Sequence, residues 1–210
     1  MVKVYGPAMS LDASGTIGKA IVFSKWKGRH YIRERIVPAN PRSGLQVGFR
    51  AMFKFLAENW APLGAPDKAS YETLADSMAI SPFNAYIRAN QRRWRNYKAP
   101  SRNIAAPETG DVCTWNGGTP AATGGPSNVT LAMTPAAREE NWGVAIFRST
   151  GTGFTPGISN CVAVLLVNTE DEFTWVDSPL TVDTYYYDTR RFTVEGLWGA
   201  LDGEINAAST

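Results

Sequence analysis

Cysteine and histidine are scarce in this sequence, which contains two cysteines, Cys113 and Cys161, and one histidine, His30, among 210 residues. Two thiols and one imidazole cannot supply a four-ligand zinc site without help from carboxylates, so we expect no bound metal. The two cysteines are predicted to be free, buried apolar side chains in a reducing compartment. One disulfide within the second half of the chain is the alternative.

Long apolar runs are also absent. No stretch of about 18 apolar residues exists, so no transmembrane helix and no membrane partner are expected. The first 15 residues lack the apolar stretch of a secretory signal. We therefore expect the protein to stay in a cytoplasm, or to leave the cell by lysis or inside a particle. With 44% hydrophobic and 11% aromatic residues, the chain has enough apolar material for folded cores.

Signatures of catalysis are missing as well. There is no Gly-x-Ser-x-Gly elbow, and His30 lies in a basic turn where a buried, oriented imidazole is not expected. The acidic clusters at 139–140 and 170–172 are predicted to be solvated loops, because sequence neighbours cannot flank a scissile bond by themselves. The glycine pairs at 117–118 and 124–125 lack a following Lys-Ser/Thr and are predicted to be loop tips. We predict no enzyme, no cofactor and no small-molecule substrate.

Charge, by contrast, is plentiful and unevenly distributed. Residues 1–103 carry 17 Lys and Arg against 6 Asp and Glu, whereas residues 104–210 carry 4 against 13. The net charge of +2 for the whole chain therefore conceals a basic half and an acidic half. Such asymmetry predicts two modules with different surroundings, or two surfaces that attract each other between subunits.

The start of the basic half predicts strands and little core. Residues 1–19 contain three glycines among small polar residues and are expected to form an extended arm. Residues 20–24 and 31–37 are predicted strands, joined by a glycine-containing turn at 25–30. Because an isolated two-stranded ribbon is marginal in water, we expect this hairpin to lean on another element.

Three helices are predicted next. The first begins near Ser43, which fits a capping box with Gln46, although Asn40 is a rival cap. The second covers 66–78. The third begins with a serine cap followed by proline and covers 81–97.

The second half changes to a period-two pattern interrupted by turn residues. Seven short strands in about a hundred residues indicate an antiparallel β-sandwich over 111–207, joined by a linker at 101–110 to a basic hairpin-and-helix module at 20–100. The predicted fold class is therefore α+β with two modules. The predicted strands are 112–115, 129–133, 143–148, 161–167, 172–176, 184–192 and one near 200–206.

Parts of this sandwich resemble a fibronectin type III or related immunoglobulin-like domain. Residues 128–135, 143–149 and 184–187 are similar to strands B, C and F of that fold. The resemblance implies that a tyrosine of the third segment hydrogen-bonds back to the preceding corner, and alternation favours Tyr185. Arg191 departs from the pattern, because the family often has a small residue there. No activity follows, since sandwiches host many functions.

The basic half is similar to the N-terminal regions of structural proteins from tailed phages and prophages over residues 18–95. The similar features are a glycine-rich start, the turn at 26–28, the segment 40–43, an aromatic helix that ends at Trp60, and the segment 83–86. Joined to an immunoglobulin-like domain, such an anchor resembles a virion accessory protein: a capsid decoration, head-fibre, collar or tail component. The resemblance implies other virion proteins and copies of the chain itself as partners. It also implies residence in the virion, assembled in the host cytoplasm.

The basic surfaces are the candidate functional sites. Arg88, Arg92 and Arg95 recur at helical spacing and predict one basic stripe. Cations also alternate with aromatic residues along the predicted hairpin, and arginine beside aromatics is an interface composition. We therefore predict a protein-docking surface. The candidate partner-binding residues are Lys25, Trp26, Lys27, Arg29, Arg33, Arg35, Arg88, Arg92 and Arg95.

Two alternatives stay open. In a DNA-binding protein, the basic half would neutralise phosphates while Trp26, Tyr31 and Trp94 stack on bases, with steep salt dependence. In a carbohydrate-binding adhesin, an exposed platform of Trp142, Trp175 and Trp198 would stack on sugars. Possible nucleic-acid contact is therefore retained beside the virion hypothesis.

Overall fold

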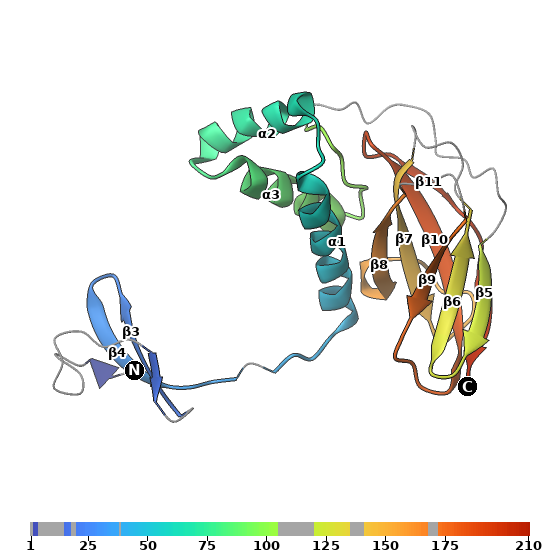
Figure 1. Cartoon of the computed structure of the whole chain (residues 1–210), viewed down its shortest axis with the longest axis horizontal. Helices are drawn as coiled ribbons and strands as arrows, with labels where there is room; N and C mark the ends of the chain where they lie inside the picture. Colours follow the sequence, from blue (N-terminus) through green and yellow to red (C-terminus); the bar gives the residue numbers. More distant parts are fainter. Residues whose placement is uncertain are drawn as a thin grey trace. The chain divides into compact units, whose positions relative to one another are not determined.

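The computed structural model describes residues 2–3, 15–17, 20–37, 39–104, 120–134, 141–167 and 172–210. The chain divides into two compact units, Met1–Pro41 (unit 1) and Arg42–Thr210 (unit 2). Unit 1 is an antiparallel sheet, and unit 2 combines three helices with two antiparallel sheets, so the protein is α+β (Figure 1).

The central part of unit 1 is a β-hairpin. β3 (Ile21–Trp26) and β4 (Arg29–Glu34) are joined by Lys27 and Gly28, which have positive φ values of 48° and 77°. Positive φ at both turn positions matches the right-handed twist of a hairpin, and Gly28 adopts it without strain. The predicted hairpin is confirmed, with a turn that is shorter than 25–30.

Two further strands complete the sheet of unit 1. β1 (Val2–Lys3) pairs with β4, and β2 (Gly15–Ile17) pairs with β3, which gives the order β1-β4-β3-β2. Parts of the predicted arm at 1–19 are therefore strands, and its other residues, apart from these, lie outside the described ranges. Every unit 1 side chain whose exposure is described is half-buried or exposed, so the described part of this sheet has no buried core.

All three predicted helices are present. They are α1 (Gly44–Trp60), α2 (Ala65–Met78) and α3 (Pro82–Arg95). The Ser81 hydroxyl caps α3 by accepting a backbone N–H at 3.2 Å, as predicted. Ser43 precedes α1 but its side chain makes no capping hydrogen bond, so the predicted capping box does not form.

The two sheets of unit 2 face each other. The smaller sheet has the order β5-β6-β9, with β5 (Ala121–Gly125), β6 (Asn128–Met133) and β9 (Phe173–Asp177). In the larger sheet the order is β11-β10-β7-β8, and β12 also pairs with β10. Its strands are β7 (Asn141–Ser149), β8 (Cys161–Leu166), β10 (Asp183–Thr193), β11 (Trp198–Leu201) and β12 (Ile205–Ser209).

Six of the seven predicted strands correspond to described strands, and the last is divided into β11 and β12. The predicted strand at 112–115 lies outside the described residues. β5 was not predicted, because its glycines at 124–125 indicated a loop tip. Gly124 is required there, since an added Cβ would lie 1.8 Å from the carbonyl oxygen of Ala208 in β12.

An apolar core fills the space between the two sheets. β6 buries Val129 and Leu131, which share one cluster with Val144 of β7 and Tyr187 of β10. The Tyr185 hydroxyl donates to the carbonyl oxygen of Thr181 at 3.2 Å, which is the corner contact predicted for this tyrosine.

Two arginines inside the sandwich form ion pairs. Arg148 of β7 contacts Asp177 of β9 at 2.7 Å, so this ion pair joins the two sheets. Arg191, where the resemblance expects a small residue, is buried and pairs with the carboxylate of Asp202. β10 continues past Arg191 to Thr193, and its register shifts near its end, between Arg190 and Phe192 against β11 and between Phe192 and Thr193 against β7.

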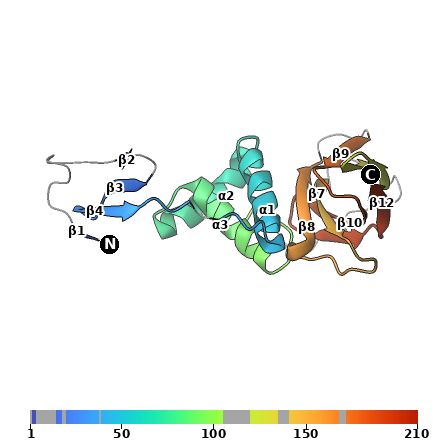
Figure 2. The ribbon, with the colours of Figure 1, turned by 90° about the horizontal axis from the view of Figure 1, so that it is seen from below.

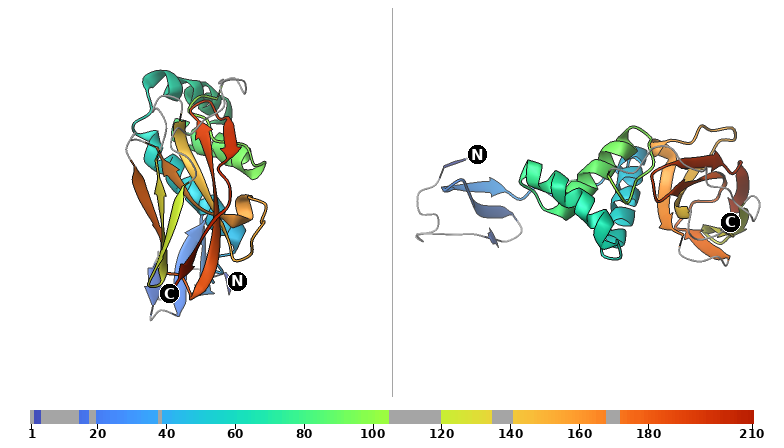
Figure 3. Two further views of the ribbon diagram at one scale, coloured as in Figure 1. Left: turned by 90° about the vertical axis from the view of Figure 1, so that its right-hand side faces the viewer. Right: turned by 90° about the horizontal axis from the view of Figure 1, so that it is seen from above.

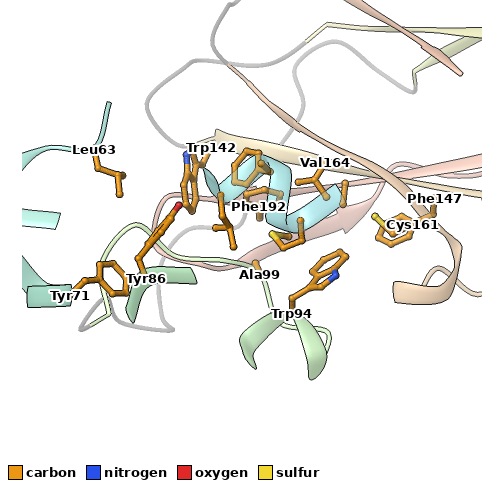
Figure 4. Packing of buried hydrophobic residues seen from close by; sticks show 14 residues of the cluster. Leu63, Tyr71, Tyr86, Trp94, Ala99, Trp142, Phe147, Cys161, Val164 and Phe192 are labelled. Carbon is orange, nitrogen blue, oxygen red and sulfur yellow. The ribbon is translucent and has the colours of Figure 1, made fainter. Parts of the chain in front are cut away.

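α1 lies on the outer face of the larger sheet, against β8, while α3 packs on α1 and α2 packs on α3 (Figures 2 and 3). A second core forms there and includes Trp142, Phe147 and Phe192 (Figure 4). The Phe55 ring of α1 lies 5.0 Å from the ring of Trp142 and 5.4 Å from that of Phe192. Trp94 of α3 belongs to the same cluster. Because helices and sandwich share one core, the unit boundary falls at Pro41 rather than in the predicted linker at 101–110.

The start of α1 approaches the sandwich backbone closely. An added Cβ at Gly44 would lie 2.1 Å from the carbonyl oxygen of Ser159, and one at Gly48 would lie 2.2 Å from that of Ile158. The Trp94 indole also donates to the Gly48 carbonyl at 3.2 Å. Because glycine has no side chain, Gly44 and Gly48 allow α1 to pack directly against the backbone of residues 158–159.

Candidate functional site

The predicted partner-binding residues fall on both units of the structure. Six belong to the hairpin of unit 1, and three belong to α3 of unit 2. They therefore do not form a single module, and each group is described by itself. The unit 1 group is Lys25, Trp26, Lys27, Arg29, Arg33 and Arg35, and the unit 2 group is Arg88, Arg92 and Arg95.

The register of the unit 1 sheet gathers arginines and aromatic residues on one face. Trp26 of β3 lies opposite Arg29 of β4, and Tyr31 and Arg33 follow at intervals of two residues along β4. Residues that are opposite or two apart in an antiparallel pair point to the same face. Trp26 is 65% exposed, and the Lys27 ammonium lies 4.9 Å from its ring centroid. This basic-aromatic face can bind an anionic, planar or apolar surface.

The opposite face of the same sheet is apolar and open. Ile17 pairs with Ile21, and Phe23 pairs with Ile32, so all four side chains share that face. Polar residues border them, because Glu34 lies opposite Ile21 and His30 lies opposite Lys25. Ile17 is 58% exposed and Ile21 is 43% exposed. The sequence pattern did not distinguish two faces of the hairpin, because only the pairing with β2 places Ile17 beside Ile21. Lys25 belongs to this face, while Arg35 follows β4.

The arginine stripe of α3 is divided by its surroundings. Arg88 and Arg92 line a pocket of about 360 Å³ between α2 and α3, whereas Arg95 is exposed and is not part of it. Lys98 lines the same pocket. Arg93 also lines the pocket, and its guanidinium group joins α3 to other segments. It donates to the carbonyl oxygens of Ala99 at 2.7 Å and Gly196 at 3.0 Å.

Apolar side chains complete this pocket. Leu74 and Met78 of α2, Ala89 of α3 and Ile104 line it, and Ile104 is 42% exposed. The Arg88 guanidinium donates to the Met78 sulfur at 3.1 Å, which places a positive charge directly on the apolar lining. Leu74 and Met78 recur at helical spacing, which places them on one face of α2 but does not predict a pocket.

Several aromatic residues that were considered for binding are buried. Trp94 is fully buried against α1 and cannot stack on a base. Trp142 is buried in the second core, and Trp198 is half-buried with its indole donating to the Tyr97 carbonyl at 2.9 Å. The sugar-stacking platform of Trp142, Trp175 and Trp198 therefore does not form, because these side chains are in the helix–sheet core or in the other sheet.

Buried titratable groups in unit 2 serve packing. The Tyr71 hydroxyl donates to the Ser101 carbonyl at 2.9 Å, and the amide of Asn90 joins the same contact. Burial raises the pKa of Tyr71 to about 12. Tyr86 is buried beside it, and its hydroxyl has no hydrogen-bond partner within the described ranges. These contacts hold Ser101, at the start of the predicted linker, against the helices.

The remaining sequence predictions concern thiols and acidic clusters. Cys161 is free and buried, and burial raises its pKa to about 12, so it is an unreactive thiol at neutral pH. Cys113 lies outside the described residues, as do 117–118, 139–140 and 170–171. Among the described residues, no group of three potential metal-binding side chains occurs, and no helix is long and apolar enough to cross a membrane.

Comparison with known proteins gives little further information. No family model matches the chain, and no curated protein matches it significantly. The crystal structure of the chicken CNTN1 FN1-FN3 domains has 15% sequence identity and a TM-score of 0.34, with 48% of this chain and 36% of that chain covered. A superoxide reductase (neelaredoxin) from Ignicoccus hospitalis has 8% identity and a TM-score of 0.28, with 44% and 80% covered. At these TM-scores neither likeness bears on function.

Proposed function

We propose that this chain is a non-enzymatic structural protein that docks on a larger assembly through unit 1. The assembly is the virion of a tailed phage, put together in the host cytoplasm, and the chain is a decoration, head-fibre, collar or tail component of it. Other virion proteins and copies of the chain are the partners. The assignment to a virion rests on the sequence resemblance of residues 18–95, whereas the docking role rests on the structure of unit 1.

One observation carries the docking role: the described part of the unit 1 sheet buries no side chain. An open sheet with an apolar face must cover that face with a second layer to be stable. Ile17 and Ile21 stay largely exposed. A partner surface that covers them would supply the missing layer, while Arg29 and Arg33 on the other face attract acidic groups and set the register.

Unit 2 is the projecting body in this proposal, and we propose that its sandwich is of the fibronectin type III or immunoglobulin type. Consecutive strands change sheets between β6 and β7, between β8 and β9, and between β9 and β10, which is a Greek-key pattern. The hydrogen bond from Tyr185 to Thr181 supports the same assignment. Such a domain serves as a rigid spacer without chemistry.

The test is an add-back experiment with the full-length chain. Particles are purified from a host in which the gene is deleted, mixed with labelled chain and sedimented. Ile21→Lys should lower the bound fraction at least about tenfold, because a charge in the apolar face prevents its burial. Val182→Lys is the matched control, since Val182 is 80% exposed in unit 2, and it should bind like the wild type.

Two outcomes would contradict the proposal. One is a chain that is absent from purified wild-type particles when they are analysed by mass spectrometry. The other is equal loss of binding for Ile21→Lys and Val182→Lys, which would show that unit 1 is not the docking element.

DNA binding is the second candidate, because Trp26, Tyr31, Arg29 and Arg33 share one face of the sheet. Aromatic rings beside arginines can stack on bases while the guanidinium groups contact phosphates. A gel-shift titration of the full chain at several salt concentrations distinguishes the two candidates. Tight, salt-steep binding that Arg29→Glu with Arg33→Glu abolishes would favour DNA.

A further inference from the structure

We propose that the pocket between α2 and α3 binds an acidic segment of a partner protein, with an aliphatic side chain on its lining and carboxylates at Arg88 and Arg92. This is a second binding site, in unit 2, and it is independent of docking through unit 1. Its volume of about 360 Å³ lies at the lower end of the range of about 300–1,000 Å³ that is usual for ligand sites.

The apolar part of the pocket suits the aliphatic side chain of the proposed ligand. Leu74, Met78, Ala89 and Ile104 come from two helices and the segment after α3, and each is only half-buried or exposed in the described structure. An aliphatic side chain placed among them removes apolar surface from water on both sides. A purely polar ligand would leave this lining uncovered.

The arginines of the pocket suit the carboxylates of the proposed ligand. Arg88 and Arg92 are one helical turn apart on α3, and within the described ranges neither forms an ion pair. Among the described residues that line the pocket, none is acidic. A guanidinium group binds a carboxylate through two parallel hydrogen bonds, so two arginines at this spacing suit two carboxylates of one extended segment.

The same geometry argues against nucleic acid as the occupant. Binding of single strands relies on aromatic side chains on which bases stack, and the described part of the pocket lining contains no aromatic residue. Trp94, the aromatic residue nearest to Arg92 in sequence, is fully buried on the other side of α3 against Gly48. Only the apolar lining is left to contact a base, so an acidic peptide satisfies the site better.

Fluorescence anisotropy with the full chain tests this proposal. The probe is a labelled dodecapeptide of glutamate and leucine, and the matched probe has serine in place of leucine. We expect the leucine probe to bind at low salt and the serine probe to bind at least about fivefold more weakly, because it cannot cover the lining. A single-stranded oligonucleotide of equal charge should bind more weakly than the leucine probe.

Charge reversal on α3 gives the second measurement. Arg92→Glu should weaken binding of the leucine probe at least about tenfold, since it places a carboxylate against the ligand's own carboxylates. Arg95→Glu is the matched control, because it changes the net charge equally on the same helix outside the pocket, and it should weaken binding less than about twofold. Far-UV circular dichroism confirms that both variants are folded.

The proposal is overturned by any of four results. These are no binding of the leucine probe, equal binding of the serine probe, equal loss in Arg92→Glu and Arg95→Glu, and tighter binding of the oligonucleotide. Self-association of the chain that Arg92→Glu abolishes would assign the pocket to a second copy instead. Because none of these measurements involves unit 1 or a particle, they are independent of the docking test described above.

Discussion

The two units of this chain differ in where their large side chains lie. In unit 2, Trp94, Trp142, Phe55 and Phe192 are fully buried between the helices and the larger sheet. In unit 1, Trp26 and Ile21 are exposed, and the described strands bury nothing. The comparison teaches that unit 2 has a buried core of its own, whereas the described apolar side chains of unit 1 stay half-buried or exposed.

The largest effect on stability is expected when two phenylalanines of α1, one buried and one exposed, are each replaced by alanine. Phe55→Ala should lower the free energy of unfolding of unit 2 by about 3–5 kcal/mol, because it opens a cavity between Trp142 and Phe192. Phe53→Ala, two residues away and 48% exposed, should cost less than about 1 kcal/mol. Urea denaturation followed by tryptophan fluorescence and by circular dichroism measures both. If the two signals changed at different urea concentrations, helices and sandwich would not share one core.

Alkaline pH should weaken unit 2 through its buried tyrosines. Burial raises the pKa of Tyr71 to about 12, while an unfolded tyrosine ionises near 10. The stabilisation is therefore complete below pH 10 and is lost as the pH rises from 10 towards 12, by about 2–3 kcal/mol. Urea midpoints measured between pH 8 and 12 should fall less steeply in Tyr71→Phe than in the wild type. Identical slopes would contradict the assignment.

A smaller effect separates the two adjacent buried hydroxyls. Tyr71→Phe removes the hydrogen bond to Ser101 and should cost about 1–2 kcal/mol at pH 7, because the Ser101 carbonyl loses a donor. Tyr86→Phe removes a buried hydroxyl without a partner in the described structure and should be neutral or slightly stabilising. Thermal or urea unfolding of the two variants gives the comparison directly. An equal cost at both positions would mean that the hydroxyl of Tyr86 is satisfied.

The smallest effect on stability is expected in unit 1. Trp26→Ala should change the unfolding of unit 2 by less than about 0.5 kcal/mol, because the side chain is 65% exposed and belongs to the other unit. The same substitution should weaken binding to the particles of the add-back experiment by about tenfold. A large loss of stability without a loss of binding would reverse the roles given to the two units.

The elements of this fold are largely predictable from local sequence patterns. The buried positions of β6 alternate as the sequence alternates, and the serine and proline at the start of α3 cap it as expected. The unit boundary is not predictable in this way. The polar residues near 101–110 suggest a linker. Only the three-dimensional structure shows that Trp142 and Phe192 form a second buried face of the larger sheet. The continuous apolar run at 142–147 is the one signal of it.

The candidate sites are less predictable than the fold. Arg88, Arg92 and Arg95 were correctly placed along one helix, but their spacing does not show that only the first two line a pocket. That distinction depends on how α2 and Ile104 pack beside α3, which is a tertiary contact. Likewise, the open face of unit 1 depends on the pairing of β2 with β3. The sequence pattern does not predict this pairing, although only three residues separate the two strands.

The fit of Gly44 and Gly48 against the carbonyl groups of Ser159 and Ile158 has a mechanical consequence. In the proposed docked state, a tensile force on unit 1 is transmitted along the chain and reaches unit 2 at the first turn of α1. There the force acts on a helix turn that is packed directly against the backbone of residues 158–159. Bulkier side chains at these two glycines would disrupt that packing, so the chain would yield to tension at this joint first.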